Sequence, residues 1–467
     1  MEHQEKTDRA AESSESMEIQ PERAEAGQGH HHEHRGEHSS HGRHKHHHTH
    51  HRHRHRSRRS SSNQKGSGKL LSFLKRHRGK IINISMCTVC AVLLVLLAVQ
   101  RDIIKDATEG NEGAGITASS VVIESSIYTD EVSLVHAAIS EYLRSDASVT
   151  AKSVYKKYEG YNYPLNIAVP VHYRYDIDGL PVNASVTHLR LAVSRNADFS
   201  AAKEYDLDPD GTSVALYHLE TGRTYYYRLT LAVSIGEGTT TLNTTGEFST
   251  AISPRILTIE NIPNVRDIGG WMTDSGVRIS QGLLYRGSEL DGAVAASYRL
   301  TDAGRDVLLT DLGIRFDMDL RSESVNPVPT DALGRFVTHR YYGISMYSGI
   351  FEDGETEKLR AIFSDLADKQ NYPMYMHCTY GRDRTGTVCY LLEALLGVSE
   401  EDLRREYELS AFTDSYVDSE NFAVFLADLR RMEGNTMKDK VEGYLLSIGV
   451  TAEEIASIRA IFLGTES

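Results

Sequence analysis

Residues 377–386 read HCTYGRDRTG, and this stretch decides how the chain is interpreted. The apolar run from Tyr372 to Met376 before it predicts a buried strand, and TGTVCYLLEALL (385–396) after it predicts a buried helix. Residues 378–384 would therefore form a strand-to-helix turn. Because the backbone N–H groups of such a turn converge at the positive end of a helix, the turn is expected to bind a dianion such as a phosphate group.

Three side chains in this stretch could carry out chemistry at phosphorus. Cys378 would lie at the helix N-terminus, which favours the nucleophilic thiolate. Arg384 offers a planar fork that can hold two equatorial phosphate oxygens through the transition state. The hydroxyl of Thr385 could donate to the cysteine sulfur when that sulfur becomes the leaving group. The expected catalytic residues therefore include Cys378, Arg384 and Thr385.

The remaining residues of the turn are assigned to substrate binding. They are His377, which would orient the turn from behind, and Thr379, Tyr380, Gly381 and Arg382. A bare Cys-x5-Arg pair arises by chance in many chains, and a free cysteine is often only a small buried hydrophobe. The flanking His, Gly and Thr-Gly, set between a strand and a helix, favour catalysis for Cys378. Cys389, further along the helix, is expected to be a core residue.

One carboxylate must protonate the leaving oxygen, and two aspartates are candidates. Asp383 lies inside the turn, and Asp319 lies in DMDLR (317–321) after an apolar, β-branched stretch. Asp319 and Arg321 would sit near the carboxyl end of a strand, where open α/β sheets place their ligands. Either aspartate could instead be a structural ion-pair partner. Asp383 is preferred because it is within the turn itself.

Five ordered pieces of sequence extend the pattern beyond the turn. They are NVRDIGG (264–270), LLYRGSEL (283–290), LGIRFDMDLRSES (312–324), HCTYGRDRTG (377–386) and YLLSIGVTAEEIASIRAIF (444–462). Through them, the segment from Ile259 to Leu463 resembles the bacterial cysteine-dependent protein tyrosine phosphatases of the family 3 type. That family commonly has lysine where this chain has Arg382. Within NVRDIGG, Arg266 and Asp267 are expected to brace the turn.

The resemblance implies an α/β fold with a central sheet flanked by helices over residues 253–467. It also implies an enzyme that hydrolyses phosphate monoesters through a phosphocysteine intermediate, with phosphotyrosine in proteins as the expected substrate. No metal, cofactor or nucleic-acid partner is expected. A phosphoinositide or inositol-phosphate phosphatase would use the same turn, and the extra cation of Arg382 favours a highly phosphorylated ligand. A non-catalytic surface binding protein and a sulfurtransferase or arsenate-reducing relative fit less well.

The first eighty residues have a different composition from the rest of the chain. They carry 17 Lys or Arg against 10 Asp or Glu, and 16 of the 22 histidines, in a chain of net charge −14. Almost no apolar residue precedes Leu70, so residues 1–80 are predicted to be a disordered tail. Its imidazoles could bind Zn²⁺, Ni²⁺ or Cu²⁺, or could simply be solvated and gain charge in acid.

Residues 81–99 (IINISMCTVCAVLLVLLAV) contain no charged side chain and are long enough for a single transmembrane helix. Cys87 and Cys90 in this span are expected to be small membrane-buried residues, not a redox pair. Four basic residues between Lys75 and Lys80 precede the span, so the tail is expected in the cytoplasm and the phosphatase-like domain outside the cell membrane. Residues 100–120 are rich in small residues and predict a linker.

Residues 121–252 show the short alternating runs of an all-β sandwich. HLRLAVS (188–194), TSVALYHL (212–219), TYYYRLTLAVS (224–234) and TTGEFST (244–250) are separated by turn signals. This stretch resembles a fibronectin type III-like module, chiefly through LETGRTYYYRLTLAV (219–233). The three tyrosines 225–227 should alternate between the core and the surface of the sheet. The module is expected to be a spacer or a docking surface for a partner.

Overall fold

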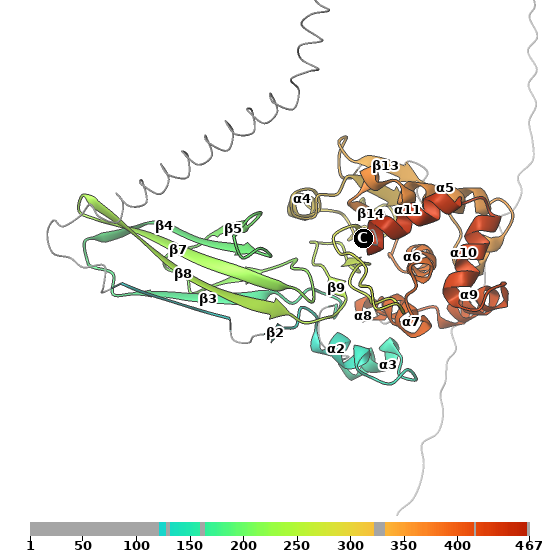
Figure 1. Ribbon diagram of the computed structural model, residues 1–467, viewed down its shortest axis with the longest axis horizontal. Coiled ribbons are helices and arrows are strands. Elements are labelled where there is room, and N and C mark those ends of the chain that lie inside the picture. Colours follow the sequence, from blue (N-terminus) through green and yellow to red (C-terminus); the bar gives the residue numbers. More distant parts are fainter. Residues whose placement is uncertain (1–120, 128–130, 159–163, 322–331, 415–416, 465–467) are drawn as a thin grey trace, which may run out of the picture. The chain divides into compact units, whose positions relative to one another are not determined.

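The computed structural model describes residues 121–464 apart from 128–130, 159–163, 322–331 and 415–416 (Figure 1). The described residues all fall within one compact unit, Ala114–Ser467. No helix among them has the length and apolar character needed to cross a bilayer. The predicted tail (1–80), membrane helix (81–99) and linker (100–120) lie outside the described residues and stay predictions.

Eight strands occupy the first part of the described chain. They are β1 (Val122–Ser126), β2 (Glu131–Val132), β3 (Val171–Asp178), β4 (Ala184–Ser194), β5 (Lys203–Asp206), β6 (Ser213–Leu216), β7 (Thr224–Ile235) and β8 (Gly238–Thr250). They form a three-stranded sheet, β1-β3-β6, and a five-stranded sheet, β2-β8-β7-β4-β5. We call these eight strands the β-domain.

The core of the β-domain follows from side-chain alternation along its longest strands. Inward-facing residues of β7 alternate with half-buried ones, as expected for one covered sheet face. Tyr225 and Tyr227 are buried and Tyr226 is half-buried, which confirms the predicted alternation. Buried residues of both sheets, among them Tyr173 from β3 and Leu229 from β7, form one hydrophobic cluster. The fibronectin-like identity of the β-domain stays a prediction.

Two helices interrupt this region, so the expectation of an all-β segment over 121–252 is wrong for residues 137–158. Helix α2 (Ala137–Leu143), helix α3 (Ala151–Tyr155) and the short η2 (Lys156–Tyr158) lie between β2 and β3. In AAISEYL the apolar Ala138, Ile139 and Tyr142 recur at helical spacing and are fully buried. They pack into the hydrophobic cluster of the C-terminal part of the chain and not into the β-domain core.

The C-terminal part contains a six-stranded sheet and a set of helices. Its strands are β9 (Arg255–Ile256), β10 (Arg266–Asp267), β11 (Leu284–Gly287), β12 (Phe316–Asp319), β13 (Thr338–Tyr341) and β14 (Met374–His377). Its helices are α4 (Asp302–Asp306), η3 (Val307–Asp311), η4 (Tyr347–Phe351), α5 (Thr356–Ala367), η5 (Lys369–Asn371), α6 (Asp383–Leu396), α7 (Glu400–Glu408), α8 (Ala411–Asp414), α9 (Ser419–Arg431), α10 (Met437–Ser447) and α11 (Ala452–Leu463).

The sheet order β13-β12-β14-β11-β10-β9 sets the position of the candidate site. Strands β11, β14, β12 and β13 are parallel, and every residue of β14 is buried, as is typical of a sheet covered on both faces. In register, His377 pairs with Gly287 on one side and with Asp319 on the other. The carboxyl ends of three parallel strands therefore meet where the 378–382 turn begins.

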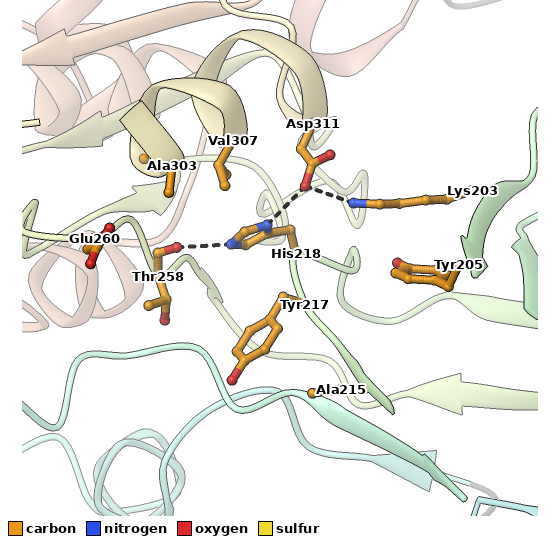
Figure 2. A pocket seen from close by; sticks show the side chains of 11 residues that line it. Lys203, Tyr205, Ala215, Tyr217, His218, Thr258, Glu260, Ala303, Val307 and Asp311 are labelled. Atoms are coloured by element: carbon orange, nitrogen blue, oxygen red, sulfur yellow. Dashed lines mark hydrogen bonds and ion pairs between the residues drawn. The ribbon is translucent and has the colours of Figure 1, made fainter. Parts of the chain in front are cut away.

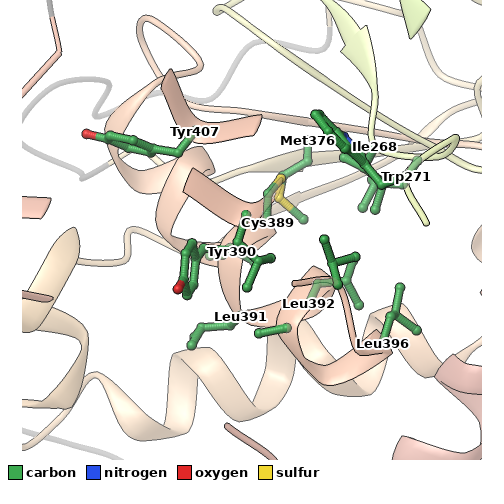
Figure 3. Packing of buried hydrophobic residues seen from close by; sticks show 14 of the residues in the cluster. Ile268, Trp271, Met376, Cys389, Tyr390, Leu391, Leu392, Leu396 and Tyr407 are labelled. Atoms are coloured by element: carbon green, nitrogen blue, oxygen red, sulfur yellow. The ribbon is translucent and has the colours of Figure 1, made fainter. Parts of the chain in front are cut away.

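Helix α6 is the central helix of this part of the protein. All residues from Thr385 to Leu396 are buried, and Cys389, Tyr390, Leu392 and Leu396 contribute to the hydrophobic cluster shown in Figure 3. A helix that is buried on all sides must be surrounded by other elements, and α6 packs against α7, α10 and α11. The helix ends at Gly397, whose backbone is left-handed at φ 91°. The predicted core position of Cys389 is confirmed, and burial raises its pKa to about 12.

Candidate active site

The 378–382 turn links β14 directly to α6 and holds the candidate nucleophile. Cys378 is a free thiol that is only 2% exposed, and Arg384 lies on the first turn of α6 and is half-buried. The predicted turn, the residue pair and the following helix therefore occur together as one strand–loop–helix unit. We call residues 378–384 the catalytic loop.

Three successive carbonyl groups of the catalytic loop accept hydrogen bonds from residues outside the loop. Glu289 N–H donates to the Thr379 carbonyl (3.1 Å), and the Asn264 amide donates to the carbonyls of Tyr380 (3.0 Å) and Gly381 (3.2 Å). In a trans peptide, the carbonyl and the next N–H point in opposite directions. The N–H groups of residues 380–382 therefore face the opposite, inner side, where an anion would sit.

A buried network of two arginines and one glutamate holds this arrangement. Arg286 Nη2 donates to the Gly381 carbonyl (2.7 Å), and its Nη1 pairs with Glu406 Oε2 (2.7 Å). Arg266 Nε pairs with Glu406 Oε1 (2.6 Å), and its Nη1 donates to Asn264 Oδ1 (2.6 Å). Burial opposes a charge on Glu406, but the two arginines together hold its pKa below the usual range. The loop is thus braced by two buried arginines that share one carboxylate.

This network agrees with one part of the bracing prediction and differs from the other. Arg266 acts on the loop through Asn264, as expected of a brace. Asp267 instead accepts from the backbone of Gly269 (2.8 Å) and Gly282 (2.6 Å) and from Arg255 (3.0 Å), so its bonds lie outside the catalytic loop. Arg286 and Glu406 were not predicted, although Arg286 lies within the quoted piece LLYRGSEL.

Gly381 is required by the shape of the loop. Its φ is +63°, a left-handed conformation that side chains disfavour, and a Cβ there would lie 2.2 Å from the carbonyl oxygen of Gly287. The backbone of the catalytic loop therefore lies in close contact with Gly287, the last residue of β11.

His377 is the last residue of β14 and directly precedes the loop. Its ring is buried, with Nε2 3.2 Å from Asp317 Oδ1 and Nδ1 donating to the Cys378 carbonyl (3.3 Å). Burial opposes the charged ring, but the carboxylates of Asp319 and Asp317 raise the pKa of His377 to about 9. Burial likewise opposes charge on Asp317, yet His377 and His339 lower the pKa of Asp317 to about 2. His377 thus contacts the backbone carbonyl of the residue that carries the candidate nucleophile.

The two candidate acids have different surroundings. Asp319 is completely buried and accepts from Arg321 through its backbone N–H, Nε and Nη2, at 2.7–3.0 Å. Arg321 is also paired with Glu289 (2.9 Å) and Asp291 (2.7 Å). Asp383 is less buried than Asp319 and accepts a hydrogen bond from the Tyr347 hydroxyl. Asp319 thus belongs to a closed ion-pair network, whereas Asp383 lies at the head of α6 within the loop.

The other predicted residues also gather at the loop. Thr385 Oγ1 is buried and has no hydrogen-bond partner among the described residues, so this hydroxyl is available to a group at the loop. Arg382 is nearly buried, with Nε 3.4 Å from the Asp383 carboxylate and its guanidinium 5.2 Å from the centre of the Tyr380 ring. Tyr380 is 39% exposed and is the outermost side chain of the loop.

A separate cavity of about 440 Å³ lies elsewhere (Figure 2). Residues of β5 and β6 line one part of it, and residues of α4 and η3 line another. Within it, His218 Nε2 lies 3.0 Å from the Thr258 carbonyl, and Lys203 pairs with Asp311 at 2.7 Å. None of the catalytic-loop residues lines this cavity. Its one lysine is already paired, so it is not the phosphate site.

Part of this chain is similar to known proteins. The Tyrosine phosphatase family matches residues 257–464. A tyrosine-protein phosphatase of Nostoc commune is 28% identical over 211 residues, which cover 34% of this chain and 70% of the relative. A protein of Cupriavidus necator, provisionally named a tyrosine-protein phosphatase, is 28% identical over 236 residues, covering 44% of this chain and 79% of the relative.

A solved structure is also similar, but only weakly. The core catalytic domain of the PP-IP phosphatase SIW14 of S. cerevisiae has 17% sequence identity and a TM-score of 0.21, covering 32% of this chain and 92% of that domain. A score this low carries no argument about substrate. The family match spans strands β10 to β14, the catalytic loop and helix α6, and both curated relatives are named as tyrosine-protein phosphatases, so the comparisons support a protein-tyrosine phosphatase.

Proposed function

We propose that this protein hydrolyses phosphate monoesters, chiefly phosphotyrosine in proteins, through a phosphocysteine intermediate. The observation that carries the proposal is the catalytic loop itself. Cys378 directly follows strand β14, Arg384 lies on the first turn of α6, and Asn264 and Arg286 donate to the loop carbonyls of Tyr380 and Gly381. The inward N–H groups and the arginine fork are suited to the charge of a transferring phosphoryl group.

In the first step, the Cys378 thiolate attacks phosphorus and forms the S–P bond while the bond from phosphorus to the phenolic oxygen breaks. Arg384 and the loop N–H groups stabilise the equatorial oxygens. Asp383 gives its proton to the departing phenolate, so the product leaves as the neutral phenol.

In the second step, water attacks phosphorus, the S–P bond breaks and inorganic phosphate is released. The electron pair returns to the Cys378 sulfur. The unpartnered hydroxyl of Thr385 is well suited to donate to this sulfur as charge returns to it. The ionised Asp383 takes a proton from the attacking water and is ready for the next cycle.

An inositol-phosphate substrate is the rival for the same loop. This alternative is suggested by Arg382, whose extra positive charge would favour a highly phosphorylated ligand. In the structure, Arg382 approaches the Asp383 carboxylate and lies over Tyr380, so its charge is already engaged within the loop. This arrangement favours a substrate with a single phosphate at the site.

Replacing the nucleophile tests the proposal. Cys378→Ser should lower kcat on an aryl phosphate at least about a thousandfold, because a helix end cannot ionise a hydroxyl as it does a thiol. The variant should keep the thermal transition of the parent. Vanadate should inhibit the parent by occupying the loop, whereas EDTA should leave activity intact. Residual activity within tenfold of the parent, or loss of activity in EDTA, would contradict the mechanism.

We also propose that the enzyme is anchored in the cell membrane by residues 81–99, with the His-rich tail in the cytoplasm and the phosphatase domain outside. The uncharged span and the basic residues before it support this topology. The β-domain would then act as a spacer or as a docking surface for a partner.

A further inference from the structure

A small cavity of about 310 Å³ lies beside the catalytic loop. Its walls include Ile167 from the segment before β3, Ile259, Ile262 and Pro263 from the segment between β9 and β10, and Tyr298. We propose that this cavity is a specificity subsite that receives an apolar side chain of the phosphotyrosine-containing protein substrate. The inference rests on the proposed function and adds to it the chemistry of the residue beside the phosphotyrosine.

Two contacts connect the cavity to the catalytic loop. The Asn166 amide, which lines the cavity, donates to Asn264 Oδ1 (3.0 Å), and the Asn264 amide donates to the Tyr380 carbonyl (3.0 Å). On the other side, the Tyr298 ring meets the Tyr380 ring edge-on, with 6.0 Å between their centroids. A peptide whose phosphotyrosine enters the loop beside the exposed Tyr380 would thus bring its neighbouring residues to this cavity.

The lining of the cavity selects the type of group that can enter. None of the described residues that line it carries a charge, and six of them are Ile, Leu or Pro. A second phosphate would lose its hydration there without gaining a cation. An aliphatic or aromatic side chain would remove apolar surface from water on both partners. The volume lies at the small end of the range for ligand pockets, so it suits one side chain.

The first test measures kcat/KM of the full chain on a series of phosphotyrosine peptides. Leu, Phe or Asp is placed in turn at each of the three positions before and after the phosphotyrosine. At one position, Leu or Phe should exceed Asp by about tenfold or more, the scale on which a hydrophobic pocket discriminates. Equal rates for Leu, Phe and Asp at every position would overturn the inference. So would a higher kcat/KM on inositol hexakisphosphate than on every peptide.

The second test uses variants in the cavity. Ile167→Asp places a charge in the half-buried wall, and the ratio of kcat/KM for the preferred apolar peptide to the Asp peptide should fall to within about twofold of one. Ile252→Asp is the matched control, because Ile252 is 72% exposed and does not line the cavity; it should keep the parental ratio. A parental ratio in Ile167→Asp would overturn the inference.

Ser297→Trp covers the case in which Ile167→Asp does not fold. Ser297 is exposed at the rim, so an indole there fills the cavity without removing a core contact, and it should also abolish the preference. A retained preference in this variant would count against the subsite. Failure of the proposed function looks different, since the parent would then hydrolyse neither an aryl phosphate nor any peptide.

Discussion

The two aspartates near the nucleophile differ in the groups that they contact. Asp319 accepts hydrogen bonds from three donor groups of Arg321, which also pairs with Glu289 and Asp291. These bonds hold Asp319 within a network of buried ion pairs. Asp383 accepts from the Tyr347 hydroxyl and lies in the loop that receives the phosphate. These surroundings favour Asp383 as the general acid and Asp319 as a structural carboxylate.

Substitution of each aspartate should separate these roles. Asp383→Asn should slow hydrolysis of a phosphotyrosine peptide by about a hundredfold or more, with a smaller loss on an aryl phosphate whose phenol has a low pKa. It should also remove the basic limb of the pH–rate profile. Asp319→Asn should lower both activities alike and reduce the free energy of unfolding by about 2 kcal/mol, because Arg321 loses a buried partner. The reverse pattern would assign the acid to Asp319.

His377 should make the stability of the domain depend on pH. Its pKa is raised to about 9 in the folded protein, from about 6.5 in the unfolded chain. The stability contributed by the charged ring is therefore fully present below pH 6.5 and is lost as pH rises through 9. The urea concentration at the unfolding midpoint should be measured at pH 6 and pH 9 for the parent and for His377→Gln. Between these two pH values the midpoint of the parent should fall more than that of the variant. Equal pH dependence of the two proteins would rule out this coupling.

At the scale of elements, the β14–loop–α6 unit depends on close contact with β11. Gly381→Ala should lower kcat/KM at least tenfold, because the added methyl meets the Gly287 carbonyl in a left-handed backbone conformation. Gly276→Ala is the control: it has the same sign of φ, at +78°, but no atom within 4 Å of the new methyl. The control should lose some stability and keep full activity. Similar kinetic losses in both variants would show that backbone strain alone is responsible.

Local sequence was sufficient to predict the β14–loop–α6 unit, but it was insufficient to predict the side chains that hold the loop in place. The strand, turn and helix of residues 374–396 could be predicted because apolar runs on both sides bound a polar, glycine-containing turn. Arg286 and Glu406 could not, because they meet the loop only after folding brings together residues 95 and more positions apart. The helices α2 and α3 were missed for the same reason, because the partners of Tyr142 lie far away in the sequence. The Tyr142 hydroxyl donates to Glu408, and the Tyr142 carbonyl accepts from the Arg405 side chain.

At the scale of the whole molecule, the predicted topology can be tested in cells. Protease added to intact cells should degrade the phosphatase domain and spare the His-rich tail, if the basic residues before the span lie in the cytoplasm. Antibodies against each end of the chain would report the fragments. Protection of the C-terminal domain would reverse the orientation.

Helix α7 touches both the active site and the start of the described chain. Glu406 pairs with the two arginines that brace the catalytic loop. Glu408, two residues further along the helix, accepts from the Tyr142 hydroxyl and from the backbone N–H of Ala151. The helices between β2 and β3 therefore share one hydrophobic cluster with residues of the C-terminal part of the chain. An excised fragment beginning at residue 253 would leave the surface under α2 and α3 bare, and such a fragment would be prone to aggregate even though it contains every catalytic residue.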